Sequence, residues 1–260
     1  MRVAMVQMGV VGGDREGNVG RAVALIGEAA GGGAEVAVLP ECMDLGWTHP
    51  SSEELADEIP DGVVCRALRE AARESGVYVC SGLTERSGEG VYNAAVLIDP
   101  EGEVVGRHRK VNELAIGEAF YGPGEGMSVV ETALGRVGLM ICADGFAEGL
   151  APARELGALG AEVVLSPCAW AVEADHDNDV EPYGALWRDS YVPVAREFGM
   201  AIVGVSNVGE MTAGPWAGRR CIGCSLAIGR AGEELVQGPY GVEAECVLYL
   251  ELELGRRAGG

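Results

Sequence analysis

Short apolar runs rich in valine recur along this chain and alternate with longer stretches of helical periodicity. Such runs are typical of strands buried on both faces, and their alternation with helices predicts βαβ units. Strands are predicted at residues 2–7, 35–40, 77–82, 136–142, 162–167, 201–209, 221–229 and 245–254, and helices at 18–30, 65–76, 147–160 and 183–199. Two further strands, 92–99 and 103–110, flank the turn sequence PEGE and form a hairpin. We therefore expect a mixed α/β layered fold.

The ends of the predicted helices and the length of the chain add three expectations. Asn18 is a plausible N-cap of the first helix, and Pro193 should kink or break the last one. At 260 residues the chain is long enough for one large domain with a substantial core. Because no linker, repeat or break in composition is visible, residues 1–260 are predicted to form a single domain.

The net charge of the chain argues against some classes of binding partner. The formal net charge is -21, which argues against nucleic acid and anionic membrane surfaces. No apolar run is long enough to span a bilayer, and the first residues read as a strand, not as a signal peptide. We therefore expect a cytoplasmic protein, while the charge says nothing direct about the substrate.

The chain has eight cysteines, for which free thiols are the best interpretation in a cytosolic chain of this size. Cys221 and Cys224 form one C-x-x-C, but no second pair follows, so the spacing is read as chance. The sequence DHDND at 175–179 is acidic but departs from the calcium-loop pattern, with Val180 at the sixth position and Leu186 at the twelfth. No metal or cofactor is predicted.

Three predicted strands end in reactive side chains, namely Glu41, Lys110 and Cys142, and Lys110 is the only lysine in the chain. In open α/β sheets, working residues gather at the carboxyl ends of strands, so these three groups are candidates for one pocket. Each also has a plainer interpretation, as a loop acid, a surface charge or a small buried side chain. Cys80 and Cys168 also follow apolar runs, so position alone does not identify a nucleophile.

The order of three motifs is more specific than any one of them. VLPE, then HRKV with GEAFYGPGE downstream, then GLMICAD closely resemble the nitrilase, or carbon-nitrogen hydrolase, superfamily, over most of the chain from Arg2 to near Ser206. The resemblance implies a catalytic triad of Glu41, Lys110 and Cys142, and a second glutamate at Glu118. It also implies a four-layer αββα sandwich, with two mixed sheets flanked by helices, that forms a homodimer or higher homo-oligomer.

These residue types suit a thioester mechanism. A cysteine attacks a carbonyl carbon as the thiolate, and Glu41 would take its proton as general base. Lys110 would stabilise the oxyanion, helped by a backbone N–H, that of Ala143. Glu118 would hold Lys110 or position substrate, or is a loop acid. Lysine is a compact point charge and arginine a wide planar fork, which explains a lysine in a narrow pocket.

The residues after the nucleophile bear on the substrate. True nitrilases have Trp-Glu after the cysteine, whereas this chain has Ala143-Asp144. Asp144 matches the amidase and carbamoylase branches and is a substrate-binding candidate, although the GFAEG that follows departs from their pattern. Trp170 forms either a wall of the substrate pocket or part of the core. We expect a hydrolase of small linear amides or N-carbamoyl compounds. The alternatives are nitrile hydrolysis, acyl transfer, or a catalytically silent binding module.

Overall fold

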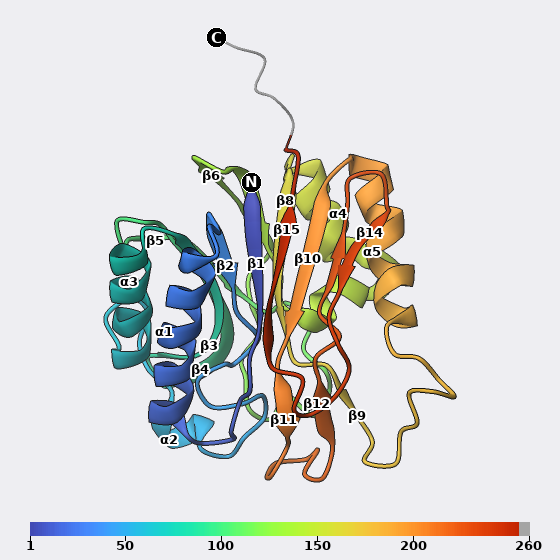
Figure 1. Ribbon diagram of the computed structural model, residues 1–260. Coiled ribbons are helices and arrows are strands. Elements are labelled where there is room, and N and C mark those ends of the chain that lie inside the picture. The colour runs from blue at the N-terminus through green and yellow to red at the C-terminus, as the bar shows by residue number, and fades with distance from the viewer. Residues whose placement is uncertain (255–260) are drawn as a thin grey trace.

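Two six-stranded sheets lie face to face with helices on both outer sides, as Figure 1 shows for the computed structural model, which describes residues 1–254. The strand order is β15-β1-β2-β3-β4-β5 in the first sheet and β14-β13-β10-β8-β7-β6 in the second. A small third sheet has the order β11-β12-β9. The predicted four-layer αββα arrangement is confirmed. Residues 255–260 of the predicted domain lie outside the described residues.

The first sheet is mixed: β1, β2 and β3 are parallel, and β15, β4 and β5 add antiparallel pairs. Its strands are β1 (Arg2–Gln7), β2 (Val36–Val38), β3 (Tyr78–Ser87), β4 (Gly90–Ile98), β5 (Val104–Arg109) and β15 (Cys246–Glu251). The helices of this half are α1 (Arg15–Gly31), the short α2 (Ser52–Leu55) and α3 (Val63–Ser75).

The second sheet is also mixed, with β7, β8 and β10 parallel. Its strands are β6 (Val129–Thr132), β7 (Gly135–Leu139), β8 (Val163–Cys168), β10 (Ala201–Ser206), β13 (Leu226–Ile228) and β14 (Glu234–Gln237). Two 3-10 turns, η1 (Cys142–Phe146) and η2 (Glu148–Leu150), lead into α4 (Ala151–Ala158), and α5 (Ala185–Phe198) follows. The third sheet consists of β9 (Ala171–Val172), β11 (Val208–Glu210) and β12 (Arg220–Ile222).

Alternating side chains build three apolar layers. On β1, Val3 and Met5 face the second sheet, whereas Ala4 and Val6 pack under α1 and α3. On β10 the same alternation sends Ile202 toward α4 and α5. Strand β1 lies against β10, and β4 against β7. Because successive side chains of a strand point to opposite faces, runs without polar interruption fill both layers at once.

Some boundaries differ from the prediction. The predicted strand 221–229 is split into β12 and β13, because Gly223 and Cys224 adopt positive φ angles of 67° and 57° between them. Helix α5 continues through Pro193 to Phe198, so the helix does not break there. The short strands β6 and β14, at the far edges of the second sheet, were not predicted.

The first helix begins earlier than expected. Its N-cap is Asp14, whose side chain accepts from the Gly17 N–H at 3.1 Å. Asn18 lies inside the helix, fully buried, and hydrogen-bonds three backbone groups. Its Oδ1 accepts from Val11 N at 2.9 Å, and its Nδ2 donates to Val11 O at 2.7 Å and to Asp44 O at 2.9 Å. Asn18 therefore ties the loop after β1 to the loop after β2.

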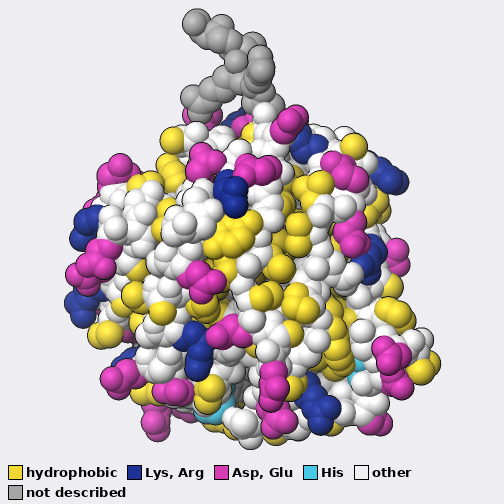
Figure 2. Space-filling view, in the orientation of Figure 1, with side chains coloured by type: hydrophobic (Ala, Val, Ile, Leu, Met, Phe, Trp, Pro, Cys, Tyr) yellow, Lys and Arg dark blue, Asp and Glu magenta, His cyan; other side chains and the backbone are white. Residues whose placement is uncertain are grey.

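Charged side chains are spread around the face seen in Figure 2, with acidic groups more frequent than basic ones, and apolar side chains gather near its middle. This matches the formal net charge of -21. Within residues 1–254, no helix combines the length and apolar character needed to cross a membrane.

We predict that Asn18→Ala lowers the free energy of unfolding by about 2–4 kcal/mol, because three buried backbone groups lose their partner. Urea denaturation followed by circular dichroism measures this. Gly20→Ala is the matched control on the same helix, since a Cβ there meets nothing within 4 Å; it should stabilise the protein by about 0.5–1 kcal/mol. An Asn18→Ala variant as stable as the parent contradicts the role of this side chain.

Candidate active site

Glu41, Lys110 and Cys142 line one cavity of about 250 Å³. Glu41 follows β2 and Lys110 follows β5, both in the first sheet, whereas Cys142 follows β7 in the second. The three residues singled out at predicted strand ends therefore meet, although they come from two sheets and lie far apart in the sequence.

Close backbone packing holds Glu41 in place. Its N–H donates to the carbonyl of Cys168, at the end of β8, at 3.2 Å. On the other side β3 approaches so closely that a Cβ on Gly82 would lie 2.5 Å from the Glu41 Cα. Only glycine fits there. The carboxylate accepts a hydrogen bond from Asn93 Nδ2, 2.7 Å from Glu41 Oε1. Both the main chain and the side chain of Glu41 are thus positioned before substrate arrives.

Lys110 lies between two carboxylates and is almost closed to water. Its Nζ is 2.8 Å from Glu41 Oε1 and 2.9 Å from Glu113 Oε1, and its side chain is 2% exposed. Trp47 Nε1 donates to Glu113 Oε1 at 3.2 Å, and Asn93 Nδ2 donates to Glu113 Oε2 at 3.1 Å. Asn93 therefore bridges the two acids that flank the lysine.

The second carboxylate beside Lys110 belongs to Glu113 and not to Glu118. Glu118 is exposed and forms no ion pair with Lys110 in the described part of the chain. A tight turn, in which the N–H groups of Gly117 and Glu118 donate to Leu114 O at 2.7 and 3.2 Å, carries this stretch away from the lysine. Glu113 takes the place instead. Its separation of three residues from Lys110 was the available signal.

Cys142 occupies a sharp turn at the start of η1. Its φ is +42°, a left-handed conformation that residues with a Cβ adopt only when the surroundings impose it. The turn follows β7 directly and leaves Cys142 on the cavity wall. Ala143 is buried behind it, and its carbonyl accepts from Asn112 Nδ2 at 2.6 Å. The role of the Ala143 N–H in binding an oxyanion stays a prediction.

Asp144 does not line the cavity, so its expected substrate contact is not seen. Asp144 is fully buried. Its carboxylate tolerates this burial because it accepts hydrogen bonds from three backbone N–H groups, those of Ile141 at 2.8 Å, Val111 at 3.1 Å and Asn112 at 2.8 Å. His108 Nε2 lies 2.8 Å from Asp144 Oδ2. The side chain thus joins the turn that carries the cysteine to the segment that carries the lysine.

Burial sets the protonation states of the site. Burial raises the pKa of Cys142 well above its usual value, and a hydrogen bond to Cys168 and the charge of Glu41 add to this, while Lys110 opposes it. Burial also raises the pKa of Glu41, against the lowering effects of Lys110 and Asn93. Burial alone would lower the pKa of Lys110, but the negative charges of Glu41 and Glu113 and the hydrogen bond to Glu41 outweigh it, and that pKa is raised. The surroundings therefore favour the uncharged thiol of Cys142 and the charged ammonium of Lys110.

Aromatic side chains form most of the remaining cavity wall. Trp170 both lines the cavity and belongs to the core, so the two expected positions coincide, and it stacks on Trp187 with ring centres 4.5 Å apart. Phe146 meets the edge of Trp187 at 5.3 Å, and Trp47 meets Trp216 at 4.9 Å. Of these rings the sequence analysis singled out only Trp170. The available signal was composition, because the chain has four tryptophans and all of them line this cavity.

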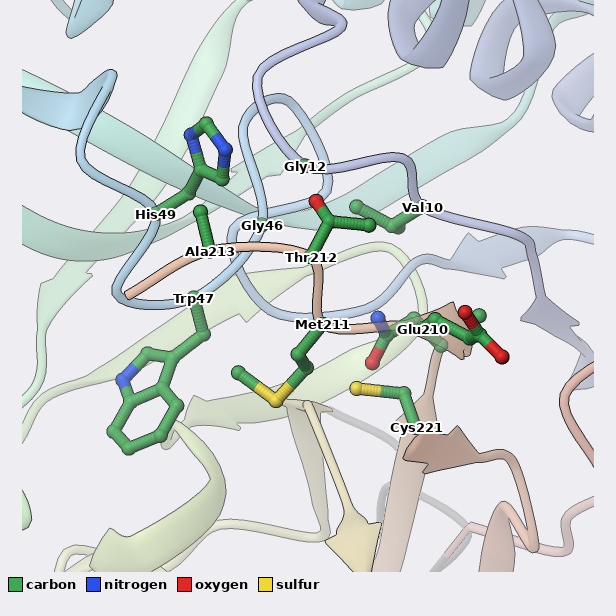
Figure 3. Close-up of a pocket in the computed structure, with 12 residues that line it drawn as sticks. Val10, Gly12, Gly46, Trp47, His49, Glu210, Met211, Thr212, Ala213 and Cys221 are labelled. Carbon is green, nitrogen blue, oxygen red and sulfur yellow. The ribbon is translucent and has the colours of Figure 1, made fainter. Parts of the chain in front are cut away.

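A second cavity, shown in Figure 3, shares Trp47 with the first and holds His49, Thr212 and Cys221 among its lining residues. Its volume is about 20 Å³, enough for roughly one water molecule and too small for an amide substrate. Cys221 and Cys224 are buried free thiols. Among residues 1–254, no group of three or more His, Cys, Asp and Glu side chains is arranged to hold a metal ion.

Comparison with curated proteins finds enzymes that cleave carbon–nitrogen bonds. A protein named nitrilase from Pyrococcus abyssi is 36% identical over 171 residues, which is 64% of this chain and 64% of that protein. An omega-amidase of Danio rerio is 36% identical over 55% of this chain and 54% of its own length. The chain thus matches less than two thirds of the length of these relatives. An (R)-stereoselective amidase from a Pseudomonas species is 29% identical over 80% of this chain and 72% of its own length.

Solved structures share the fold over nearly the whole chain. A carbon-nitrogen hydrolase from Helicobacter pylori superposes with a TM-score of 0.85 at 21% identity, covering 97% of this chain and 89% of that one. An amidase from a Nesterenkonia species superposes with a TM-score of 0.80 at 24% identity, covering 97% and 90%. The sequence model of the carbon-nitrogen hydrolase family matches residues 2–258. This chain therefore belongs to the carbon-nitrogen hydrolase family.

Proposed function

We propose that the protein is a cysteine-dependent hydrolase of non-peptide C–N bonds in small linear amides or N-carbamoyl compounds. The observation that carries the proposal is the shared cavity of Glu41, Lys110 and Cys142, with the lysine 2.8 Å from one carboxylate and 2.9 Å from another. A buried cation is costly unless it is paired, and here it faces the space where a reacting carbonyl would lie. The names of the relatives, which include amidases and an omega-amidase, support the same bond class.

The first half of the reaction forms a thioester. Glu41 takes the proton of the Cys142 thiol while the sulfur attacks the carbonyl carbon of the amide. The carbonyl oxygen becomes an oxyanion, which the ammonium of Lys110 stabilises. Collapse of the intermediate breaks the C–N bond, and Glu41 returns the proton to the nitrogen, so that ammonia or an amine leaves. The acyl group remains on the sulfur.

The second half uses water in place of the amine. Glu41 takes a proton from a water molecule that attacks the thioester carbon, and a second oxyanion forms beside Lys110. The C–S bond then breaks, the carboxylic acid leaves, and Cys142 regains its proton from Glu41. Glu113 and Asn93 keep Lys110 and Glu41 in position through both halves. The homodimer or higher oligomer implied by the family resemblance stays a prediction.

We predict that wild-type protein releases ammonia from at least one amide in a screen of aliphatic amides, arylalkyl amides, ω-amides of dicarboxylates, N-carbamoyl amines and nitriles. Cys142→Ala should release none. A solved mutant of the Nesterenkonia amidase shows the acetamide moiety of fluoroacetamide added to its active-site cysteine. Fluoroacetamide should accordingly label Cys142 alone among the eight cysteines, with loss of activity, as peptide mass spectrometry can show. Labelling spread evenly over the cysteines, without protection by substrate, contradicts the proposal.

We predict that Lys110→Arg folds normally but lowers kcat/KM by about a hundredfold or more, because a guanidinium cannot place its charge where the compact ammonium lies. Circular dichroism and steady-state kinetics measure the two properties. Arg107→Lys is the matched control on the strand that leads to Lys110: this side chain is 39% exposed, contacts Glu85 at 3.2 Å and lies outside the cavity, so the change should preserve most activity. Wild-type rates in Lys110→Arg remove this residue from the mechanism.

The pH dependence should report the base. Glu41 acts when it is unprotonated, and burial raises its pKa above the ordinary value of 4.5. The acidic limb of kcat/KM should therefore lie above pH 4.5, with activity lost as the pH falls through the raised pKa. Asn93 lowers that pKa by hydrogen bonding, so Asn93→Ala should move the limb to higher pH. A limb that stays in place in Asn93→Ala contradicts the assignment of Glu41 as the base.

A further inference from the structure

The walls of the catalytic cavity carry information about the acyl group. We propose that the substrate is an uncharged amide whose acyl group ends in a flat apolar ring, as in an arylalkyl amide, and that ω-amides of dicarboxylates are poor substrates. This rests on the proposed function, because it concerns the same site. It departs from what the name of the omega-amidase relative suggests.

Aromatic rings dominate the wall in two groups. One group, Phe146, Trp170, Tyr183 and Trp187, is continuous: Trp170 and Trp187 stack with an angle of 21° between the rings, and Tyr183 lies 6.1 Å from Trp170. Trp47 and Trp216 form the other group. Aromatic side chains pair by offset stacking and edge-to-face contact, which a ring in the substrate can extend. A short polar acyl group would leave this surface uncovered.

The charge of the cavity disfavours a distal carboxylate. Lys110 is the one cationic side chain among the described residues that line it, and Glu41 and Glu113 already pair with that ammonium. A second carboxylate on the substrate would enter a mostly apolar space that has no unpaired cation among its lining residues, and it would lie close to two acids. Burial of an unpaired charge is strongly unfavourable.

Two arginines near the wall, Arg188 and Arg219, are already paired. Arg188, next to Trp187, lies 2.7 Å from Glu234 and donates to Gln237 at 2.7 Å. Arg219 pairs with Glu173, and its guanidinium lies over Trp216, 4.0 Å from the ring centre. Neither lines the cavity. The carboxylate clamp that a dicarboxylate amide needs is therefore missing from the described walls.

The volume agrees with a ring of modest size. A dry cavity of roughly 150 Å³ is known to hold benzene. The 250 Å³ found here leaves room for a phenyl ring, a short linker and the amide that must reach Cys142. Leu186, half exposed at 52%, lines the same cavity and gives its outer part an apolar character.

Binding can be measured without turnover. All four tryptophans line the cavity, so the intrinsic fluorescence of the Cys142→Ala variant should report its occupancy. The probes are 3-phenylpropanamide and its twin 3-(4-carboxyphenyl)propanamide, which differ by one carboxylate at the far end. The neutral amide should bind at least about tenfold more tightly than the twin. Equal or tighter binding of the carboxylate twin, or no binding of either, overturns the proposal.

Turnover separates this proposal from the proposed function. In wild-type protein, kcat/KM for 3-phenylpropanamide should exceed that for propanamide, and Trp216→Ala should reduce this ratio by about tenfold. Leu235→Ala, an exposed apolar position outside the cavity, is the control and should leave the ratio unchanged. If the carboxylate twin is hydrolysed faster, the substrate class proposed here is wrong, whereas the proposed hydrolase activity stands. If the neutral amide binds tightly but no amide is hydrolysed, the binding preference stands and the proposed hydrolase activity is wrong.

Discussion

The buried carboxylate of Asp144 is the contact on which the site depends. Cys142 follows a strand of the second sheet, and Glu41 and Lys110 follow strands of the first, so the arrangement of the three side chains depends on how the two sheets are held together. Asp144 accepts backbone N–H groups from both sides of that junction, at Ile141 before the cysteine and at Val111 and Asn112 after the lysine. Apolar packing between the sheets is not directional, whereas these hydrogen bonds set the register of one turn against the other.

The charged side chains around Lys110 are buried, and this burial costs stability while it shifts the pKa values of the site. An ammonium that is 2% exposed persists because Glu41 and Glu113 lie within 2.9 Å. Loss of one partner from a buried pair leaves an uncompensated charge and typically costs about 3–5 kcal/mol. The same burial raises the pKa of Cys142 and of Glu41. Burial thus favours the uncharged forms of both side chains, and the charge of Lys110 opposes this.

The fold and the three central residues were predictable because their signals are local or ordered along the chain. Buried strands read as valine-rich runs, and Glu41, Lys110 and Cys142 each follow such a run. Glu113 was not singled out, and Asp144 was expected at the substrate, because the positions of both depend on the course of loops, which spacing alone does not determine. Asn18 looked like a cap, since an amide at a helix start normally is one; the structure uses it to satisfy a buried loop. The four tryptophans that line the cavity come from four separate segments of the chain, and the sequence order does not predict that they meet.

Trp47 lines both the larger cavity and the 20 Å³ cavity, so this one side chain contributes to the walls of two separate spaces. A smaller side chain at Trp47 would remove wall from both of them at once. The same indole donates to Glu113, the partner of Lys110. The shape of the larger cavity and the hydrogen bonding of the acid beside Lys110 are thereby linked through a single residue, so a substitution at Trp47 changes both.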